Sequence, residues 1–297
     1  METTGPRQSM AWKLSTLRID MIIVYILCAM LLLAALWLLT MRTKRKKEDF
    51  FGLAKFHYAH RGLHGNGIPE NSLAAFSLAV NHGFGAELDV HLTKDHRLVV
   101  IHDKTLKRTT GAEGMVEDAT LKELKSLNLE GTQEKIPLLQ EVLPLFEGKA
   151  PLIIEIKAVK GNHAELTRRV CELLVNYPKL KFCIESFDPR VLRWLKKHRP
   201  NIIRGQLSCD FVRRKNGLPL VLAVLLTNLS LNFWTVPHFI AYRFEDRSKL
   251  ALRICRKIWG VQEFSWTIKS KADAKTALAD GAPIIFEHIQ EDLCTIN

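Results

Sequence analysis

The sequence lacks the cysteine pattern of a disulfide framework or a zinc site. Its six cysteines are widely spaced and none belongs to a C-x-x-C pair; they are Cys28, Cys171, Cys183, Cys209, Cys255 and Cys294. A disulfide scaffold and a zinc module are therefore not predicted. Free thiols inside apolar runs behave as small hydrophobic side chains, which is consistent with a reducing compartment.

Acidic residues are scarce relative to basic ones. The chain has 31 Asp and Glu against 43 Lys and Arg, which gives a formal net charge of +12 at pH 7. This excess favours anionic partners, such as membrane phospholipids or phosphate-bearing substrates. Nucleic acid is not expected as a partner, because the chain lacks zinc-ligand spacing, an RNA-binding aromatic motif and a basic heptad pattern.

One long uncharged run lies near the N-terminus, from Met21 to Met41. A helix of this length rises about 30 Å, the thickness of the hydrocarbon core of a bilayer. The sequence therefore predicts a short tail over residues 1–20 and one transmembrane helix over residues 21–41. A cleaved signal peptide and a buried soluble helix are the alternatives. The first is disfavoured by the length of the run and the lack of a small-x-small site, and the second by apolar residues on all faces.

A basic linker, residues 42–54, follows the apolar run. It begins Arg42-Thr43-Lys44-Arg45-Lys46-Lys47, whereas the opposite side of the run carries Arg7, Lys13 and Arg18. Because positive charge accumulates on the cytoplasmic side of membrane helices, we expect the domain that follows to be cytoplasmic.

A second uncharged stretch runs from Gly217 to Tyr242 and is interrupted by prolines and asparagines. A core helix and strand with a loop are the favoured interpretation of this stretch. A patch that dips into the membrane interface is the next alternative, and a second membrane span is the third.

Short β-rich runs alternate with helical patterns from residue 55 onward. About eight such units in roughly 240 residues predict a TIM (β/α)8 barrel over residues 55–297 rather than an open doubly wound sheet. Lys104 to Glu147 breaks the alternation and is predicted to be a small insertion after the second strand unit. The expected strands are 56–60, 86–90, 98–102, 152–156, 181–185, 202–206, 229–231, 261–266 and 283–286. The expected helices are 71–81, 163–176, 189–198, 246–259 and 272–279.

Three carboxylates stand in otherwise apolar strand patterns. Glu87 and Asp89 are two residues apart and so share one face of their strand, and Glu155 lies in Ile153-Ile154-Glu155-Ile156-Lys157. Together they predict a site for a hard cation, magnesium or calcium, which prefers oxygen ligands. Structural ion pairs are the alternative interpretation of these carboxylates.

Two histidines end predicted strands, where barrel enzymes carry their catalytic groups. These are His60, in Tyr58-Ala59-His60-Arg61-Gly62, and His102, in Val99-Val100-Ile101-His102-Asp103. Imidazole titrates near neutral pH, so the two side chains are candidates for an acid and a base. Arg61 is a candidate for holding a phosphate oxygen.

Seven short motifs follow one another along this part of the chain. They are His60-Arg61-Gly62, Pro69-Glu70-Asn71-Ser72, Glu87-Leu88-Asp89-Val90, Leu98-Val99-Val100-Ile101-His102-Asp103, Leu106-Lys107-Arg108-Thr109-Thr110-Gly111, Ile136-Pro137-Leu138-Leu139 and Glu155-Ile156-Lys157. In kind and order they resemble the glycerophosphodiester phosphodiesterase family. The likeness continues through Ser186-Phe187-Asp188-Pro189 and Ser265-Trp266-Thr267, and so covers roughly residues 55–290.

The resemblance implies a role for each matching residue. A calcium or magnesium ion is implied at Glu87, Asp89 and Glu155, and an acid-base pair at His60 and His102. Phosphate or substrate contacts are implied for Arg61, Lys157 and Trp266, and support of the metal site for Glu70. In the family's reaction the glycerol 2-hydroxyl attacks phosphorus, and water then opens the cyclic phosphate to give glycerol 3-phosphate. The chain departs from the family after the last strand, where Phe286-Glu287-His288-Ile289 replaces an Asn- or Asp-containing turn and a proline.

Three functions remain as hypotheses on these grounds. The first is hydrolysis of soluble diesters such as glycerophosphocholine or glycerophosphoethanolamine. The second is lysophospholipase D activity, which releases lysophosphatidic acid from lysophospholipids and is favoured by the apolar stretch. The third is a membrane-anchored scaffold that binds phosphate headgroups without catalysis.

Overall fold

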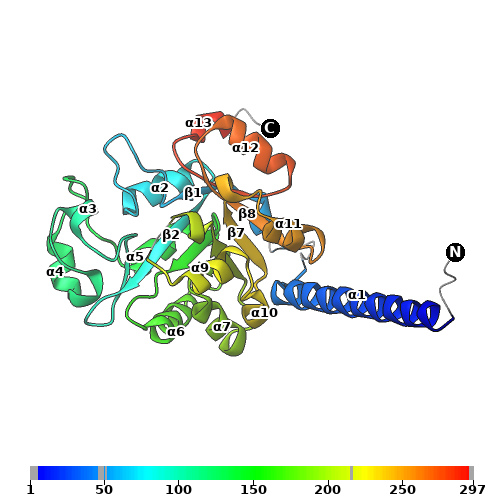
Figure 1. The fold of residues 1–297 in the computed structure, drawn as a ribbon. Coiled ribbons are helices and arrows are strands. Elements are labelled where there is room, and N and C mark those ends of the chain that lie inside the picture. The colour runs from blue at the N-terminus through cyan, green and yellow to red at the C-terminus, as the bar shows by residue number, and fades with distance from the viewer. Residues whose placement is uncertain (1–5, 46–49, 51, 215–216, 294–297) are drawn as a thin grey trace.

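A computed structural model describes residues 6–45, 50, 52–214 and 217–293 of the chain. One long helix, α1 (Pro6–Thr40), projects from a barrel that contains the rest of the described chain (Figure 1). The predicted tail is thus helical from Pro6 onward.

Eight parallel strands close into a barrel. Their order around it is β1, β2, β4, β5, β6, β7, β8 and β9, and β9 pairs with β1 to complete the ring. The predicted TIM barrel is therefore confirmed. The strands are β1 (Tyr58–His60), β2 (Gly85–Leu92), β4 (Leu152–Ile156), β5 (Phe182–Ser186), β6 (Arg204–Ser208), β7 (Phe239–Arg243), β8 (Gln262–Ile268) and β9 (Ile284–Phe286).

Apolar side chains fill the end of the barrel at which the strands begin. Tyr58, Phe239 and Phe264 pack there with Ile153 and Cys183. Because inward-facing residues recur every second position, the next inward layer on three of these strands is polar. Residues two positions further along are His60, Glu155 and Glu185, so the barrel has an apolar floor and an acidic mouth.

Three of the helices that pack outside the barrel begin at residues whose side chains cap them. Ser72 and Ser270 accept hydrogen bonds from the first turns of α2 (Leu73–Asn81) and α12 (Lys271–Ala279). Asp188 does the same for α7 (Pro189–His198), whose first residue is proline. The remaining long helices are α5 (Leu139–Phe146), α6 (His163–Leu174) and α11 (Leu250–Lys257). The five expected helices are thus confirmed, with ends that shift by a few residues.

The expected strand at 98–102 differs from the prediction in length and direction. The strand β3 (Leu98–Val100) pairs antiparallel with the end of β2 and lies outside the ring of eight. The chain leaves β2 at the mouth of the barrel and returns along it. The insertion then contains α3 (Lys107–Thr110), the 3-10 turn η2 (Val116–Asp118) and α4 (Leu121–Ser126). Its apolar residues form a cluster of their own that includes Ile101, Leu124 and Ile136.

The expected strand at 229–231 is wrong. Leu229 has a positive φ of 55° and lies in the turn between α9 (Leu220–Thr227) and α10 (Asn232–Thr235), and the barrel strand that follows β6 is β7 instead. Leu229 is apolar because it packs against Met41 and Ile240 and not because it is in a strand. The connection between β6 and β7 also contains α8 (Phe211–Arg214).

Within the described residues, one helical segment is long and apolar enough to cross a membrane, Asp20–Thr40 of α1, and none of it is buried in the protein. By comparison, α9 has eight residues and rises about 12 Å, too short for a second span. The favoured interpretation of the second uncharged stretch, a helix and strand of the barrel with a connecting loop, agrees with α9, α10 and β7. Two short elements, η3 (Phe244–Asp246) and α13 (Gln290–Leu293), complete the C-terminal part, and η1 (Leu53–Lys55) precedes β1.

Candidate active site

A pocket of about 410 Å³ opens at the carboxyl ends of the barrel strands. His60, Glu87, His102 and Glu155 line it together with Arg61. These residues come from three strands, from the turn after β1 and from the loop after β3. The barrel thus brings together most of the site residues that the sequence predicts.

The three predicted metal ligands form a buried cluster. Glu87, Asp89 and Glu155 each offer an oxygen atom that lies within 4.8 Å of the other two. Asp89 pairs with Glu155 in the register of β2 and β4, which explains their proximity. At most 6% of any of the three residues is exposed. The period-two argument for Glu87 and Asp89 therefore agrees with the geometry.

Carboxylates outnumber the basic side chains in this cluster. Burial, together with the neighbouring carboxylates, raises the pKa of Glu87 well above its usual value, and burial raises the pKa of Glu155 to about 7. Burial would raise the pKa of Asp89 as well, but Lys157 and Arg61 hold it well below its usual value. The Nζ atom of Lys157 lies 2.9 Å from Asp89 Oδ1 and 2.8 Å from Glu155 Oε1. The cluster therefore contains more buried carboxylate than its basic neighbours neutralise.

This excess fits a divalent cation. A hard cation requires several oxygen ligands, which the three buried carboxylates supply. A bound cation would also remove the repulsion that raises the pKa of Glu87. The residues present thus fit the metal site that the sequence predicts, with Lys157 as its nearest basic neighbour.

A tight turn after β1 places His60 and Arg61 at the pocket. Arg61 has a φ of 57° and Gly62 a φ of 81°. A Cβ on Gly62 would lie 2.8 Å from the carbonyl carbon of Ala75 in α2, so only glycine fits. His60 Nε2 lies 3.9 Å from Glu87 Oε2, and the backbone amide of Arg61 donates to that same oxygen over 3.3 Å.

Arg61 is held by two carboxylates. Its guanidinium donates to both oxygens of Glu70, over 3.0 and 3.1 Å, and its Nε atom lies 3.6 Å from Asp89. Asn71 donates to the same Asp89 oxygen over 2.9 Å. The Pro69-Glu70-Asn71-Ser72 motif therefore braces Arg61 and Asp89, in addition to capping α2.

His102 reaches the pocket by a route that the sequence did not predict. The antiparallel course of β3 returns the chain to the level of Asp89, whose carbonyl accepts a hydrogen bond from the amide of Ile101. His102 Nδ1 then lies 2.6 Å from Asp103 Oδ1. Burial lowers the pKa of His102 to about 4.

Trp266 and Lys157 occupy different positions relative to the pocket. Trp266 lines it and packs edge-to-face on Phe187, with 5.7 Å between ring centroids. Lys157 lies deeper, with a side chain that is 14% exposed and paired to the two carboxylates named above. Its ammonium group neutralises the carboxylate cluster rather than lining the open pocket.

Six further charged residues that line the pocket are absent from the prediction; they are Arg108, Glu185, Arg243, Glu245, Lys269 and Glu287. Glu185 is 1% exposed, and burial raises its pKa well above the usual value. Glu287 lies 3.7 Å from His60 Nδ1 and 2.7 Å from Lys269. Arg108 from the insertion pairs with Glu70. Of these, only Glu185 could be recognised from the sequence, because it is the last residue but one of an apolar strand, as Glu155 is.

A parallel (β/α)8 barrel with buried carboxylates and histidines at the carboxyl end of its strands is the architecture of a TIM-barrel enzyme. The profile of the glycerophosphoryl diester phosphodiesterase family matches residues 60–288 of the chain. The chain therefore belongs to this family, and it is an enzyme of the phosphoric diester hydrolase class.

Individual relatives agree with the family profile. A glycerophosphodiester phosphodiesterase of Caldanaerobacter subterraneus is 34% identical over 251 residues, which cover 80% of this chain and 96% of that protein. A rat lysophospholipase D is 38% identical over 149 residues, or 46% of this chain and 45% of that protein.

Solved structures agree with the fold. A phosphodiesterase of Oleispira antarctica, in complex with the product sn-glycerol-3-phosphate, is 26% identical with a TM-score of 0.67, over 81% of this chain and 96% of that one. A glycerophosphodiester phosphodiesterase of Thermotoga maritima is 25% identical with a TM-score of 0.63, over 82% of this chain and 98% of that one.

Proposed function

We propose that the chain hydrolyses glycerophosphodiesters, such as glycerophosphocholine or glycerophosphoethanolamine, to glycerol 3-phosphate and an alcohol. The observation that carries the proposal is the presence of His60 and His102 in one pocket with the carboxylates of Glu87 and Glu155. Family membership and the relatives named above support the same substrate class.

The two histidines have environments that suit different roles. His102, with a pKa of about 4, is neutral near pH 7 and can accept the proton of the glycerol 2-hydroxyl. Burial lowers the pKa of His60, and the carboxylates of Glu287, 3.7 Å from its Nδ1 atom, and Asp89 oppose this effect. Because these carboxylates stabilise a protonated imidazole, we assign His60 as the acid.

The reaction follows from these roles. As His102 takes the proton, the 2-oxygen attacks phosphorus, the bond to the alcohol breaks, and His60 protonates the departing oxygen. The product of this step is a cyclic phosphate. In the second step His60 accepts a proton from water, whose oxygen attacks phosphorus, and His102 returns its proton to the 2-oxygen. Arg61 would hold a phosphate oxygen, and Trp266 would pack on the glycerol.

Glu87, Asp89 and Glu155 would hold a calcium or magnesium ion. When bound, the ion would polarise the phosphate and neutralise its charge. Lys157 would add positive charge beside the phosphate and limit the repulsion between Asp89 and Glu155.

The test is cleavage of glycerophosphocholine by the purified full chain in calcium, magnesium or chelator. We expect metal-dependent release of glycerol 3-phosphate that His60→Ala abolishes. His82→Ala, an exposed histidine at the end of α2, is the matched control and should keep full activity. Undiminished release in chelator would refute the metal requirement, and full activity of His60→Ala would refute the acid-base assignment.

Lysophospholipase D activity is a second candidate, favoured by an apolar surface beside the pocket. Leu220 and Val221 on α9 are 69% and 73% exposed. The inner side of α9 belongs to a cluster that contacts Phe187 and Trp266, two residues that line the pocket. An acyl chain would thus find apolar surface next to the phosphate site. Leu220→Gln with Val221→Gln should slow lysophosphatidylcholine cleavage and leave glycerophosphocholine cleavage unchanged; equal effects on both would refute this.

We propose further that α1 anchors the enzyme in a membrane with the barrel on the cytoplasmic side. The apolar segment Asp20–Thr40 and the positive charges of Arg42, Lys44 and Arg45 support this arrangement. Protease added outside intact cells should leave the barrel uncut, and disruption of the cells should expose it. Cleavage in intact cells would show the opposite orientation.

A further inference from the structure

The end of α1 is fixed to α11 by specific contacts. Trp259 Nε1 donates to the carbonyl of Leu38 over 3.2 Å, and Cys255 Sγ donates to the carbonyl of Met41 over 3.6 Å. Met41 is fully buried in a cluster that contains Ala251 and Cys255. The C-terminal half of α11 therefore lies at the level where the proposed membrane helix ends.

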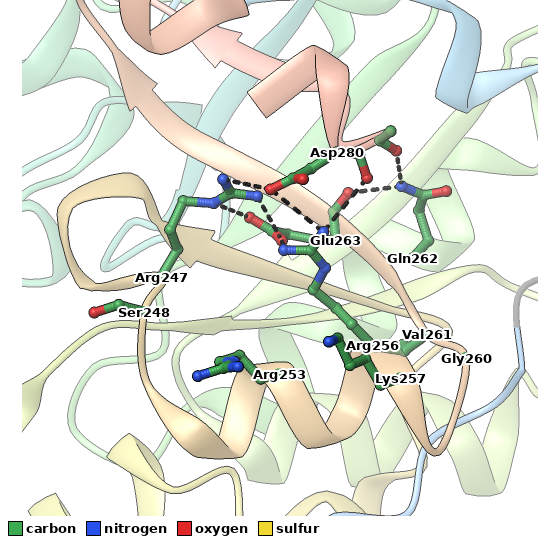
Figure 2. Close-up of a pocket in the computed structure, with 11 residues that line it drawn as sticks. Arg247, Ser248, Arg253, Arg256, Lys257, Gly260, Val261, Gln262, Glu263 and Asp280 are labelled. Carbon is green, nitrogen blue, oxygen red and sulfur yellow. Dashed lines mark hydrogen bonds and ion pairs between the residues drawn. The ribbon is translucent and has the colours of Figure 1, made fainter. Parts of the chain in front are cut away.

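A cleft of about 770 Å³ lies beside this contact, between α11 and the end of α12 (Figure 2). It is separate from the active-site pocket and shares no lining residue with it. Four basic and two acidic side chains line the cleft, so its walls carry a net positive charge. They are Arg247, Arg253, Arg256, Lys257, Glu263 and Asp280.

Two of the cations are already paired. Arg247 Nε lies 2.9 Å from Glu263, and its Nη1 atom lies 2.9 Å from Asp280. Arg256 Nη1 lies 3.0 Å from the other oxygen of Glu263. These pairs, drawn as dashed lines in Figure 2, hold the two guanidinium groups in place and leave some of their N–H donors for a ligand.

The other two cations supply the excess charge. Arg253 and Lys257 are exposed and lie one turn apart on α11, and neither has an ion pair within the described part of the chain. A third basic side chain comes from the linker. Arg45 lies against Gly260, where a Cβ would be 3.2 Å from Arg45 Cγ, so the linker adds its charge at the edge of the cleft.

Apolar and aromatic residues of α11 and of the turn after it lie near these cations. Ile258 and Leu250 are 61% and 59% exposed, and Trp259 contacts α1. Tryptophan beside basic residues at the end of an apolar helix is typical of the membrane-water interface. This position favours a lipid headgroup over a freely diffusing anion as the ligand.

We propose that the cleft between α11 and α12 binds the phosphate of an anionic phospholipid in the leaflet from which α1 emerges. The inference rests on the proposed anchoring of α1 and is independent of catalysis. Arg253 and Lys257 contact the phosphate, and Arg247 and Arg256 donate from the cleft wall. A choline headgroup is disfavoured, because it would bring a fixed positive charge against four cations.

The test uses the full chain in nanodiscs of phosphatidylcholine alone, or with a third of the lipid replaced by phosphatidylglycerol. Because a ligand that binds only the folded state raises Tm, phosphatidylglycerol should raise Tm by several degrees. Arg253→Gln with Lys257→Gln should abolish this shift while leaving Tm in phosphatidylcholine and glycerophosphocholine cleavage unchanged. Lys122→Gln with Lys149→Gln removes the same charge from exposed positions elsewhere and should keep the shift.

Four results would overturn the proposal. An equal shift in the cleft variant, or no shift in the wild type, would show that the cleft does not bind the lipid. A matching shift with inorganic phosphate in phosphatidylcholine nanodiscs would assign the cleft to free anions. Failure of the full chain to float with vesicles of either composition would refute the anchoring of α1 and the lipid site with it. Cleavage of glycerophosphocholine in detergent reports separately on the proposed catalysis.

Discussion

Arg108 donates to both carboxylate oxygens of Glu70, over 2.6 and 2.9 Å, and thereby ties the insertion to the loop after β1. The same guanidinium lies 2.6 Å from Asp103, which in turn lies 2.6 Å from His102. A chain of charges thus connects Glu70 to the proposed base. We expect Arg108 to act as a positioning residue in this arrangement, because it contacts Asp103, which in turn contacts His102.

Arg108→Gln is expected to lower kcat by about 10- to 100-fold, since small displacements of a catalytic group carry costs of that size. The side chain is 46% exposed, so Tm should change little. The measurement is the rate of glycerophosphocholine cleavage as a function of pH, where loss of the Asp103 orientation should also shift the limb assigned to His102. Arg190→Gln, which removes another exposed arginine paired with an aspartate, is the control. Equal effects of the two variants would refute the positioning role.

Glu87→Gln is expected to stabilise the protein without metal and to remove the stabilisation by metal. Burial and the neighbouring carboxylates raise the pKa of Glu87, so its charge is unfavourable in the folded protein without a cation. Removing it should increase the free energy of unfolding in chelator by about 1 kcal/mol or more, the equivalent of one pKa unit. The stabilisation of wild type by calcium or magnesium should disappear in the variant. Urea unfolding with and without metal measures both, and a metal effect that survives in Glu87→Gln would contradict the ligand assignment.

Acid sensitivity is expected to depend in part on Glu287. Its contacts with His60 and Lys269 hold its pKa below the usual value, so the folded state favours the charged form. This contribution to stability is present above the unfolded-state pKa of about 4.5 and is lost as pH falls below it toward the folded-state value. Glu287→Gln should therefore lose less stability than wild type between about pH 5 and pH 3. Urea unfolding across this range tests the prediction, and identical pH slopes would refute it.

The barrel floor is expected to tolerate no side chain at position 205. A Cβ on Gly205 would lie 2.1 Å from the ring of Phe239. Gly205→Ala should therefore reduce the free energy of unfolding by about 1–3 kcal/mol, as overpacked cores do. Adding Phe239→Leu makes space and should recover part of that loss. If the double variant lost more free energy of unfolding than the two single variants lose together, steric conflict with Phe239 would not be the cause.

The sequence predicts those parts of the fold and site that depend on local periodicity. Glu87, Asp89 and Glu155 face the barrel interior because strand side chains alternate, which is visible in the sequence alone. The same alternation places Glu185 in the barrel interior, so its position can also be predicted from the sequence. Ser72 and Asp188 mark helix starts in the same local manner.

Other features depend on contacts between distant segments. The direction of β3 is set by its pairing with β2, and the three-residue run that forms it has no directional signal. Leu229 resembles a strand residue, because burial against Met41 and Ile240 requires an apolar side chain in any backbone conformation. The ion pair between Arg108 and Glu70 joins residues 38 positions apart, which charge spacing does not predict.

The junction between α1 and α11 has a mechanical consequence. Trp259 and Met41 clamp the last turn of α1, and Lys44 continues the attachment by donating its amide to the carbonyl of Pro237 over 2.8 Å. Because the chain is held on both sides of residue 41, α1 cannot rotate freely relative to the barrel at this point. If α1 anchors the protein as proposed, it acts as a rigid support and not as a flexible tether, and it would hold the mouth of the barrel at a set height and tilt above the bilayer.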